Sequence, residues 1–314
     1  MRHLPTLLLF ALATAFIGAC GSPKENEGDV TISGSSTVQP LVSKLAGSFI
    51  SNNPRAQVEL DAPGTGEGFL LFCDGLTDIN NASRPIDPVE KRACAANGVD
   101  YVELEIARDA AVVAMSDREQ LPECLSLAQL FELTGPTSSG SDTWEGVAAD
   151  DQVPKGRFEL VAPPLGSGTS EVFVDLVIAD LAEGRAQPSE LRRDAVNVAS
   201  DQLVGDVLRE DPGSIGILGY SVASSEAGLR VLEVADKGSC VSPDRNTIED
   251  GSYPLIRSLY MYVNADRATE NATLRAFVDD VVEGDVGEMA SDTGSIPVPD
   301  PVASKNQELW SARG

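Results

Sequence analysis

The 314-residue chain contains a single histidine, His3, which lies in an N-terminal apolar segment. If that segment is removed as a signal, no histidine remains, which excludes serine–histidine and cysteine–histidine catalysis and metal sites built on imidazole. The sequence also lacks a nucleotide P-loop lysine and the G-x-S-x-G turn of hydrolases. We therefore expect a binding protein that is not an enzyme and has no cofactor and no metal site.

Residues 1–19 have the features of an export signal. Arg2 precedes an apolar run over residues 4–19, which is shorter than the ~20 residues of a membrane-spanning helix. The run ends in "IGAC", which resembles the lipobox of bacterial lipoproteins, where cleavage before Cys20 leaves a lipidated N-terminus; an ordinary secretory signal is the alternative. We predict an exported protein, anchored by lipid to the outer face of the bacterial cytoplasmic membrane or in the periplasm. Residues 20–29 would form a flexible tether.

Four cysteines remain beyond Cys20, namely Cys73, Cys94, Cys124 and Cys240. An even number in an oxidising compartment suggests two disulfides with three possible pairings, and free buried thiols are the alternative.

Acidic residues outnumber basic ones, 49 against 23, for a formal net charge of −26. Loss of Arg2 with the signal makes the chain one unit more negative. Nucleic acids and anionic membrane surfaces are therefore poor partners. A local anion site is still allowed, because remote charges are screened within about 8–10 Å.

The rest of the chain alternates short apolar strands with amphipathic helices, and its length suggests two domains. Strands are expected at 30–33, 58–60, 101–106, 111–115, 158–162, 215–218 and 259–263, and helical spacing of apolar residues recurs around 38–49, 172–181 and 274–281. This alternation predicts an α/β fold with mostly parallel sheets. The Gly/Ser-rich stretch 135–146 is expected to be a surface loop.

Three times a strand leads through Gly, Ser and Thr residues into a helix: "ISGSSTVQPL" (32–41), "APGTGEGFLLF" (62–72) and "APPLGSGTSEVF" (162–173). One such junction is explained by helix capping. Three of them can instead face one crevice at the carboxyl ends of the strands. Their amides and hydroxyls would then bind a small oxyanion.

Five segments, "SGSSTVQPL", "GTGEGFLLFCDGLTDINNASRPI", "GSGTS", "PGSIGILGYS" and "SIPVPD", resemble in order and spacing the phosphate-binding proteins of bacterial high-affinity phosphate ABC transporters. The resemblance implies a type II periplasmic-binding-protein fold, in which two α/β lobes joined by a two-stranded hinge close on the ligand. It implies delivery of phosphate to ABC permease and ATPase subunits by a monomer. Lobe 1 would comprise 30–107 and 257–314, and lobe 2 would comprise 108–256.

The resemblance also implies a set of phosphate-binding residues. The first junction would contribute Ser36, Thr37 and the amide of Val38, the second Thr65, and the third Ser167, Gly168 and Thr169.

Two positions depart from the family pattern. Many members have a carboxylate where this chain has Arg84, and it accepts the ligand's proton; many also have an arginine where this chain has Pro163. We infer that Arg84 takes over the charge-pairing role, with a surface ion pair as the alternative. Glu67 or Asp78 could supply the missing acceptor. Binding of sulfate or another oxyanion, a sensor role and hydrolysis of a phosphate ester are the competing functions.

The lobes implied by the resemblance also select one disulfide pairing. Cys73 and Cys94 would share lobe 1, while Cys124 and Cys240 would share lobe 2. Bonds within each lobe leave the hinge free to close, so we predict Cys73–Cys94 and Cys124–Cys240.

Overall fold

A computed structural model of the chain describes residues 28–118, 122, 124–140, 142–144, 157–165, 167–236 and 238–313. The predicted signal peptide, the lipidation site Cys20 and most of the tether lie outside these residues. Strand β1 (Gly28–Gly34) begins two residues earlier than expected, so Gly28 and Asp29 belong to the sheet and not to the tether. Within the described part of the chain, no helix combines the length and apolarity needed to cross a bilayer.

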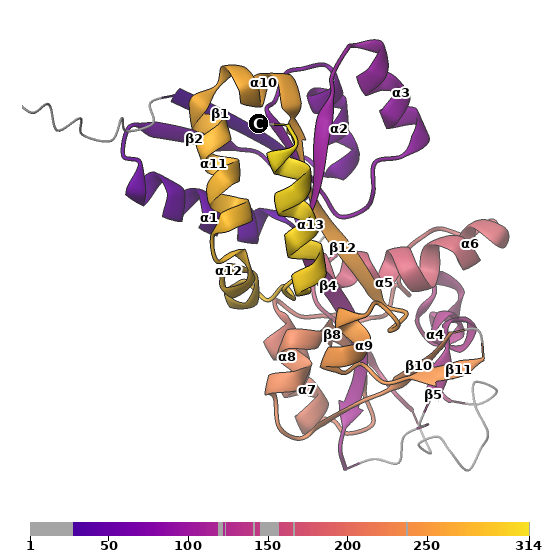
Figure 1. Cartoon of the computed structure of the whole chain (residues 1–314). Coiled ribbons are helices and arrows are strands. Elements are labelled where there is room, and N and C mark those ends of the chain that lie inside the picture. The colour runs from indigo at the N-terminus through magenta and orange to yellow at the C-terminus, as the bar shows by residue number, and fades with distance from the viewer. Residues whose placement is uncertain are drawn as a thin grey trace, which may run out of the picture.

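Two lobes lie one beyond the other, and two long strands run between them (Figure 1). Lobe 1 contains β1, α1 (Gln39–Asn52), β2 (Ala56–Leu60), α2 (Thr65–Cys73), β3 (Ile79–Ala82), α3 (Pro88–Ala96), α10 (Ala265–Glu270), α11 (Ala272–Glu283), α12 (Val286–Asp292) and α13 (Asp300–Ser311).

Lobe 2 is built from the middle of the chain. Its strands are β5 (Cys124–Ser126), β6 (Leu160–Ala162), β7 (Val196–Asn197), β8 (Ile215–Gly219), β9 (Leu229–Val231), β10 (Glu233–Asp236) and β11 (Ser239–Val241). Its helices are α4 (Leu127–Thr134), α5 (Gly168–Phe173), α6 (Asp180–Gly184), α7 (Asp201–Glu210), α8 (Tyr220–Ser225) and α9 (Arg245–Glu249). A π-helical segment, Val174–Ala179, joins α5 to α6, and a 3-10 turn, Pro136–Ser138, lies in the stretch expected to be a loop.

The connecting strands are β4 (Tyr101–Ser116) and β12 (Ile256–Asn264), which pair antiparallel along most of their length. They sit at the centre of one sheet whose strand order is β2-β1-β3-β12-β4-β8-β6-β7, with β9 also on β4. The outer pairs β1–β2, β1–β3, β6–β7 and β6–β8 are parallel, as expected. The pairs that involve the connecting strands, β3–β12, β12–β4 and β4–β8, are antiparallel. The two strands expected at 101–106 and 111–115 are one continuous strand, because β12 pairs with β4 across the residues between them.

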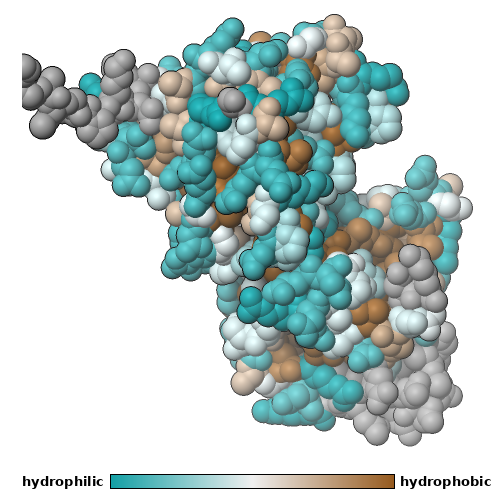
Figure 2. Space-filling view, in the orientation of Figure 1, coloured by the Kyte–Doolittle hydropathy of each residue, from teal (hydrophilic) through white to brown (hydrophobic). Residues whose placement is uncertain are grey.

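The buried apolar residues form separate cores on the two sides of the hinge. One core, in lobe 2, holds buried residues between Ala110 and Leu255. The main core of lobe 1 holds residues from Val30 to Ala107 and again from Leu259 to Trp310, and a smaller core of the same lobe includes Phe69, Phe72 and Tyr262. The exact domain bounds stay a prediction. The outline of the molecule narrows where the lobes meet, and most of the surface over α11 and α13 is hydrophilic (Figure 2).

Each lobe contains one disulfide, as predicted. Cys73 at the end of α2 is bonded to Cys94 in α3, and Cys124 in β5 is bonded to Cys240 in β11. Neither bond crosses between the lobes.

Candidate functional site

The first junction leaves β1 in a sharp turn. Gly34 has a φ of +124°, and a Cβ there would lie 2.0 Å from the carbonyl oxygen of Asn81, so only glycine fits. The backbone N–H of Thr37 donates to Ser35 Oγ at 3.2 Å. This turn brings Ser36 and Thr37 to the start of α1, where both hydroxyls contact Glu171 of lobe 2.

The third junction opens α5 in lobe 2. Ser167 caps this helix, and its Oγ accepts the N–H of Ser170 at 3.2 Å. Thr169 donates from Oγ1 to Asp201 Oδ2 at 2.8 Å, and that carboxylate also accepts the Gly219 N–H at 2.6 Å. Burial raises the pKa of Asp201, while both of these hydrogen bonds lower it. These contacts fix the start of α5 to β8.

The first and third junctions meet between the lobes. A Cβ added to Gly168 would lie 2.9 Å from Thr37 Cγ2, so the absence of a side chain there allows the close approach. Thr37 Oγ1 also donates to Glu171 Oε2 at 2.7 Å. The structure therefore brings together residues that are more than 130 positions apart in sequence, as an oxyanion site would require.

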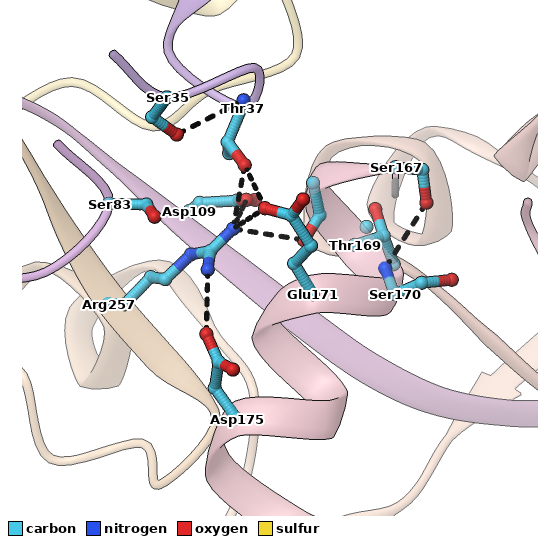
Figure 3. Close-up of polar contacts among 12 residues, drawn as sticks. Ser35, Thr37, Ser83, Asp109, Ser167, Thr169, Ser170, Glu171, Asp175 and Arg257 are labelled. Atoms are coloured by element: carbon cyan, nitrogen blue, oxygen red, sulfur yellow. Dashed lines mark hydrogen bonds and ion pairs between the residues drawn. The ribbon is translucent and has the colours of Figure 1, made fainter. Parts of the chain in front are cut away.

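Arg257, on β12, lies at the centre of this meeting point (Figure 3). Its Nη2 donates to Thr37 Oγ1 at 3.0 Å and to the carbonyl oxygen of Gly168 at 3.2 Å. Nη1 donates to Asp175 Oδ2 at 3.1 Å. The side chain is 7% exposed, and its Nε makes no hydrogen bond to any residue that the structure describes. A buried guanidinium with an unused donor is costly unless an acceptor completes its coordination.

Three carboxylates face this one guanidinium. Asp109, Glu171 and Asp175 place an oxygen 3.8, 3.5 and 3.1 Å from the nearest Arg257 nitrogen. Burial raises the pKa of Asp109, and the charge of Arg257 opposes that shift. The same two causes act in the same directions on the pKa of Asp175. Asp109 lies on β4 directly opposite Arg257 in the strand register.

The second junction lies within lobe 1. Thr65 begins α2, and its Oγ1 lies 3.1 Å from Ser83 Oγ and accepts the Ser83 N–H at 3.2 Å. No contact between Thr65 and Arg257 or Thr37 is found among the described residues. The predicted role of Thr65 in binding phosphate stays a prediction.

Arg84 forms a fork with Glu90 of α3. Its Nη1 and Nη2 donate to the two carboxylate oxygens at 2.8 and 2.7 Å, and its side chain is 42% exposed. The bond to Glu90 raises the pKa of Arg84. Glu90 also accepts the N–H of Asp87 in the capping box of α3, which holds this ion pair to the helix start.

The two acceptors suggested from the sequence are placed elsewhere. Asp78 is buried directly before β3, at the opposite end of that strand from Arg84. There it accepts a hydrogen bond from the Thr31 hydroxyl and forms an ion pair with Arg267 at 2.7 Å. Glu67 is exposed in the first turn of α2. The carboxylates nearest the meeting point of the junctions are therefore those of Asp109, Glu171 and Asp175. None of these residues is marked as a site residue by the sequence alone.

Two α/β lobes joined by two strands, with a polar site between them, form the architecture of solute-binding proteins. Comparison of sequences supports this class. Residues 21–282 match the family model described as the PBP superfamily domain. The chain is 33% identical over 293 residues to the protein SphX of Synechocystis sp., covering 92% of this chain and 84% of that protein. It is 32% identical over 294 residues to the phosphate-binding protein PstS of Staphylococcus saprophyticus, covering 91% and 87%.

The chain therefore belongs to the PBP superfamily, in the family of PstS and SphX proteins. Among solved structures, it is similar to "a possible phosphate binding protein" from Planctomyces limnophilus, with a TM-score of 0.83 and 26% identity over 92% of this chain and 99% of that one. The family expected from the sequence is confirmed, as is the two-lobed fold.

Proposed function

We propose that this protein binds inorganic phosphate between its lobes, outside the cytoplasm, and delivers it to the permease and ATPase subunits of an ABC importer. The observation that carries the proposal is the buried guanidinium of Arg257, which joins Thr37 of lobe 1 to Gly168 of lobe 2 and has an unused Nε donor. The relative named phosphate-binding protein PstS and the structural neighbour from Planctomyces support the choice of phosphate.

Arg257 supplies the cation of the proposed site from the hinge. It replaces the family arginine whose position is taken here by Pro163. A planar guanidinium offers paired donors that match two oxygens of a tetrahedral anion. Because Arg257 lies on β12, a phosphate bound to it would contact both lobes and the strand on which they turn.

The remaining donors come from the two junctions that meet. Ser36, Thr37 and the Val38 amide would bind from lobe 1, and Ser167, Gly168 and Thr169 from lobe 2. Thr169 would do so through its backbone amide, because its hydroxyl donates to Asp201. Thr65 and Arg84 stay proposed contacts, and each would have to exchange its bond to Ser83 or Glu90 for a phosphate oxygen.

Asp109 is our proposed acceptor for the proton of bound hydrogen phosphate. It lies opposite Arg257 and within 3.1 Å of a Cβ placed on Gly168, where the anion would meet lobe 2. Sulfate is fully ionised and has no proton to donate, so its oxygens would meet the carboxylate without a hydrogen bond. This arrangement favours phosphate over sulfate.

Isothermal titration of the purified protein with phosphate and with sulfate tests the function. We expect phosphate to bind and sulfate to bind at least about a hundredfold more weakly, since an unpaired buried acceptor costs ~1–3 kcal/mol and anion–carboxylate repulsion adds to it. Equal affinities would make the protein a general oxyanion binder. Turnover of a chromogenic phosphate ester would instead identify a hydrolase.

Export and anchoring are part of the same proposal. A lipid on Cys20 would keep the protein beside the permease, and a monomer would present both lobes to it. Labelling with radioactive palmitate that is lost in the C20S variant is the expected result, whereas release of the wild-type protein into the medium would contradict a lipid anchor.

A further inference from the structure

Glu171 occupies the donors that an anion between the lobes would need. Thr37 Oγ1 donates to its Oε2 at 2.7 Å, and Ser36 Oγ donates to its Oε1 at 3.5 Å. Arg257 Nη2 lies 3.5 Å from the same Oε2 (Figure 3). The carboxylate comes from α5 of lobe 2, while both hydroxyls come from lobe 1.

We infer that Glu171 is an internal competitor of phosphate, whose carboxylate must leave Ser36 and Thr37 before the anion can use them; this inference rests on the proposed function. A hydroxyl has one proton and can donate it to only one acceptor at a time. Thr37 therefore bonds either Glu171 or a phosphate oxygen, so binding is an exchange of acceptors and Glu171 lowers the affinity.

Charge leads to the same conclusion. Glu171 and phosphate are both anions, and two like charges within a few ångströms repel each other strongly in a poorly solvated site. Asp109 and Asp175 already place two carboxylates beside the single positive charge of Arg257. The Glu171 side chain is 33% exposed, so solvent is available on one side when it is displaced.

Asp175 provides a matched control. It lies one helical turn beyond Glu171 and pairs with the same guanidinium at 3.1 Å. Among the described contacts it accepts no hydrogen bond from Ser36 or Thr37. Neutralising Asp175 thus removes one negative charge from the same place without freeing the two hydroxyls.

The test is isothermal titration of phosphate into the phosphate-depleted wild-type protein and the variants E171Q, E171D and D175N. E171Q removes the charge and leaves an amide oxygen, which accepts from Thr37 more weakly than a carboxylate does. E171D keeps the charge but is one methylene too short to reach Thr37. We expect E171Q and E171D to bind phosphate about tenfold more tightly, which corresponds to one hydrogen bond to a charged group. D175N should change the affinity by less than about threefold, as for an exposed ion pair.

A second readout separates competition from a structural role. Loss of the bond between lobes should lower the melting temperature of phosphate-depleted E171D, while its phosphate affinity rises. Affinity that is unchanged or weaker in both Glu171 variants would overturn the inference while the proposed function stands. If neither the wild-type protein nor any variant binds phosphate, the proposed function fails and this inference fails with it.

Discussion

Arg257 and Asp109 are directly opposite each other on the two antiparallel strands that join the lobes. Both side chains are largely buried, and Arg257 Nη2 lies 3.8 Å from Asp109 Oδ2. A cation and an acceptor thus stand at the hinge itself, between the Ser/Thr junctions of the two lobes. The predictions below test what each of them does.

Replacing Arg257 by lysine keeps the charge but removes the planar pair of donors. We expect R257K to weaken phosphate binding by about ten- to a hundredfold, because each hydrogen bond to a charged group is worth ~1.5–3 kcal/mol. Calorimetric titration measures this. R84K is the matched control, since the guanidinium of Arg84 pairs with Glu90 and, among the described contacts, not with Thr37 or Gly168. A larger loss in R84K than in R257K would move the main cation to the second junction.

Replacing Asp109 by asparagine tests selectivity. The amide can donate to sulfate, so we expect D109N to lower the ratio of phosphate to sulfate affinity by about tenfold. Competition between the two anions, followed by titration, gives this ratio. An unchanged ratio would show that another group accepts the phosphate proton. E67Q, at an exposed position of α2, controls for the loss of one acidic residue.

The stability of the same variant should depend on pH. Burial raises the pKa of Asp109 in the folded protein, so the folded state holds this proton more tightly than the unfolded chain. The contribution of protonated Asp109 to the stability of the wild-type protein is therefore fully present below the ordinary Asp pKa of about 3.9. It is lost as the pH rises through the pKa of Asp109 in the folded protein. We expect D109N to gain stability relative to the wild type as the pH rises. Urea unfolding across this range measures the difference, and a gain that grows as the pH falls would contradict the assigned shift.

A methyl group on Gly168 should keep the lobes apart. The new Cβ of G168A would lie 2.9 Å from Thr37 Cγ2 and 3.1 Å from Asp109 Oδ2. We expect phosphate affinity to fall by about tenfold or more, because lobes held apart would lose roughly one charge-assisted hydrogen bond to the phosphate. Gly47 in α1 is the control, because nothing lies within 4 Å of its Cβ position. G47A should stabilise the helix by ~1 kcal/mol and leave binding unchanged. Equal binding by both variants would refute the close approach.

Removing the disulfide of lobe 1 should affect stability but not binding. Cys73 and Cys94 are 21 positions apart, and a loop of this length contributes ~3 kcal/mol in the chain-entropy description. We expect the C73S/C94S variant to unfold at lower urea concentration with an unchanged phosphate affinity. A large loss of affinity would show that the bond also shapes the site.

The sequence shows the parts of the candidate site that depend on local chemistry. The three junctions could be recognised because strand–turn–helix junctions need small residues and hydroxyls at fixed positions. The choice of Ser36, Thr37, Ser167 and Gly168 within them came from the family resemblance, and their binding of phosphate stays a prediction. The disulfide pairing followed from the lobes that the family resemblance implies, because it depends only on which lobe each cysteine belongs to. These features are encoded within short segments or in the order of the lobes.

The charged centre could not be found in this way. Arg257 and Asp109 meet through the register of β4 and β12, which lie about 150 positions apart and shift register at Leu259–Tyr260. In sequence, Arg108 and Asp109 lie between the two predicted strands 101–106 and 111–115, whereas the structure has one strand there. Polar residues in the middle of a buried strand were the available signal, because charges there are rare unless they are paired or used.

The crystal structure of the complex with phosphate tests the central claim most directly. Our account predicts a phosphate between the lobes, with oxygens within hydrogen-bond distance of Arg257 and Thr37, one oxygen on Asp109, and Glu171 turned away. A phosphate held by Arg84 without Arg257, or bound outside the space between the lobes, would contradict it.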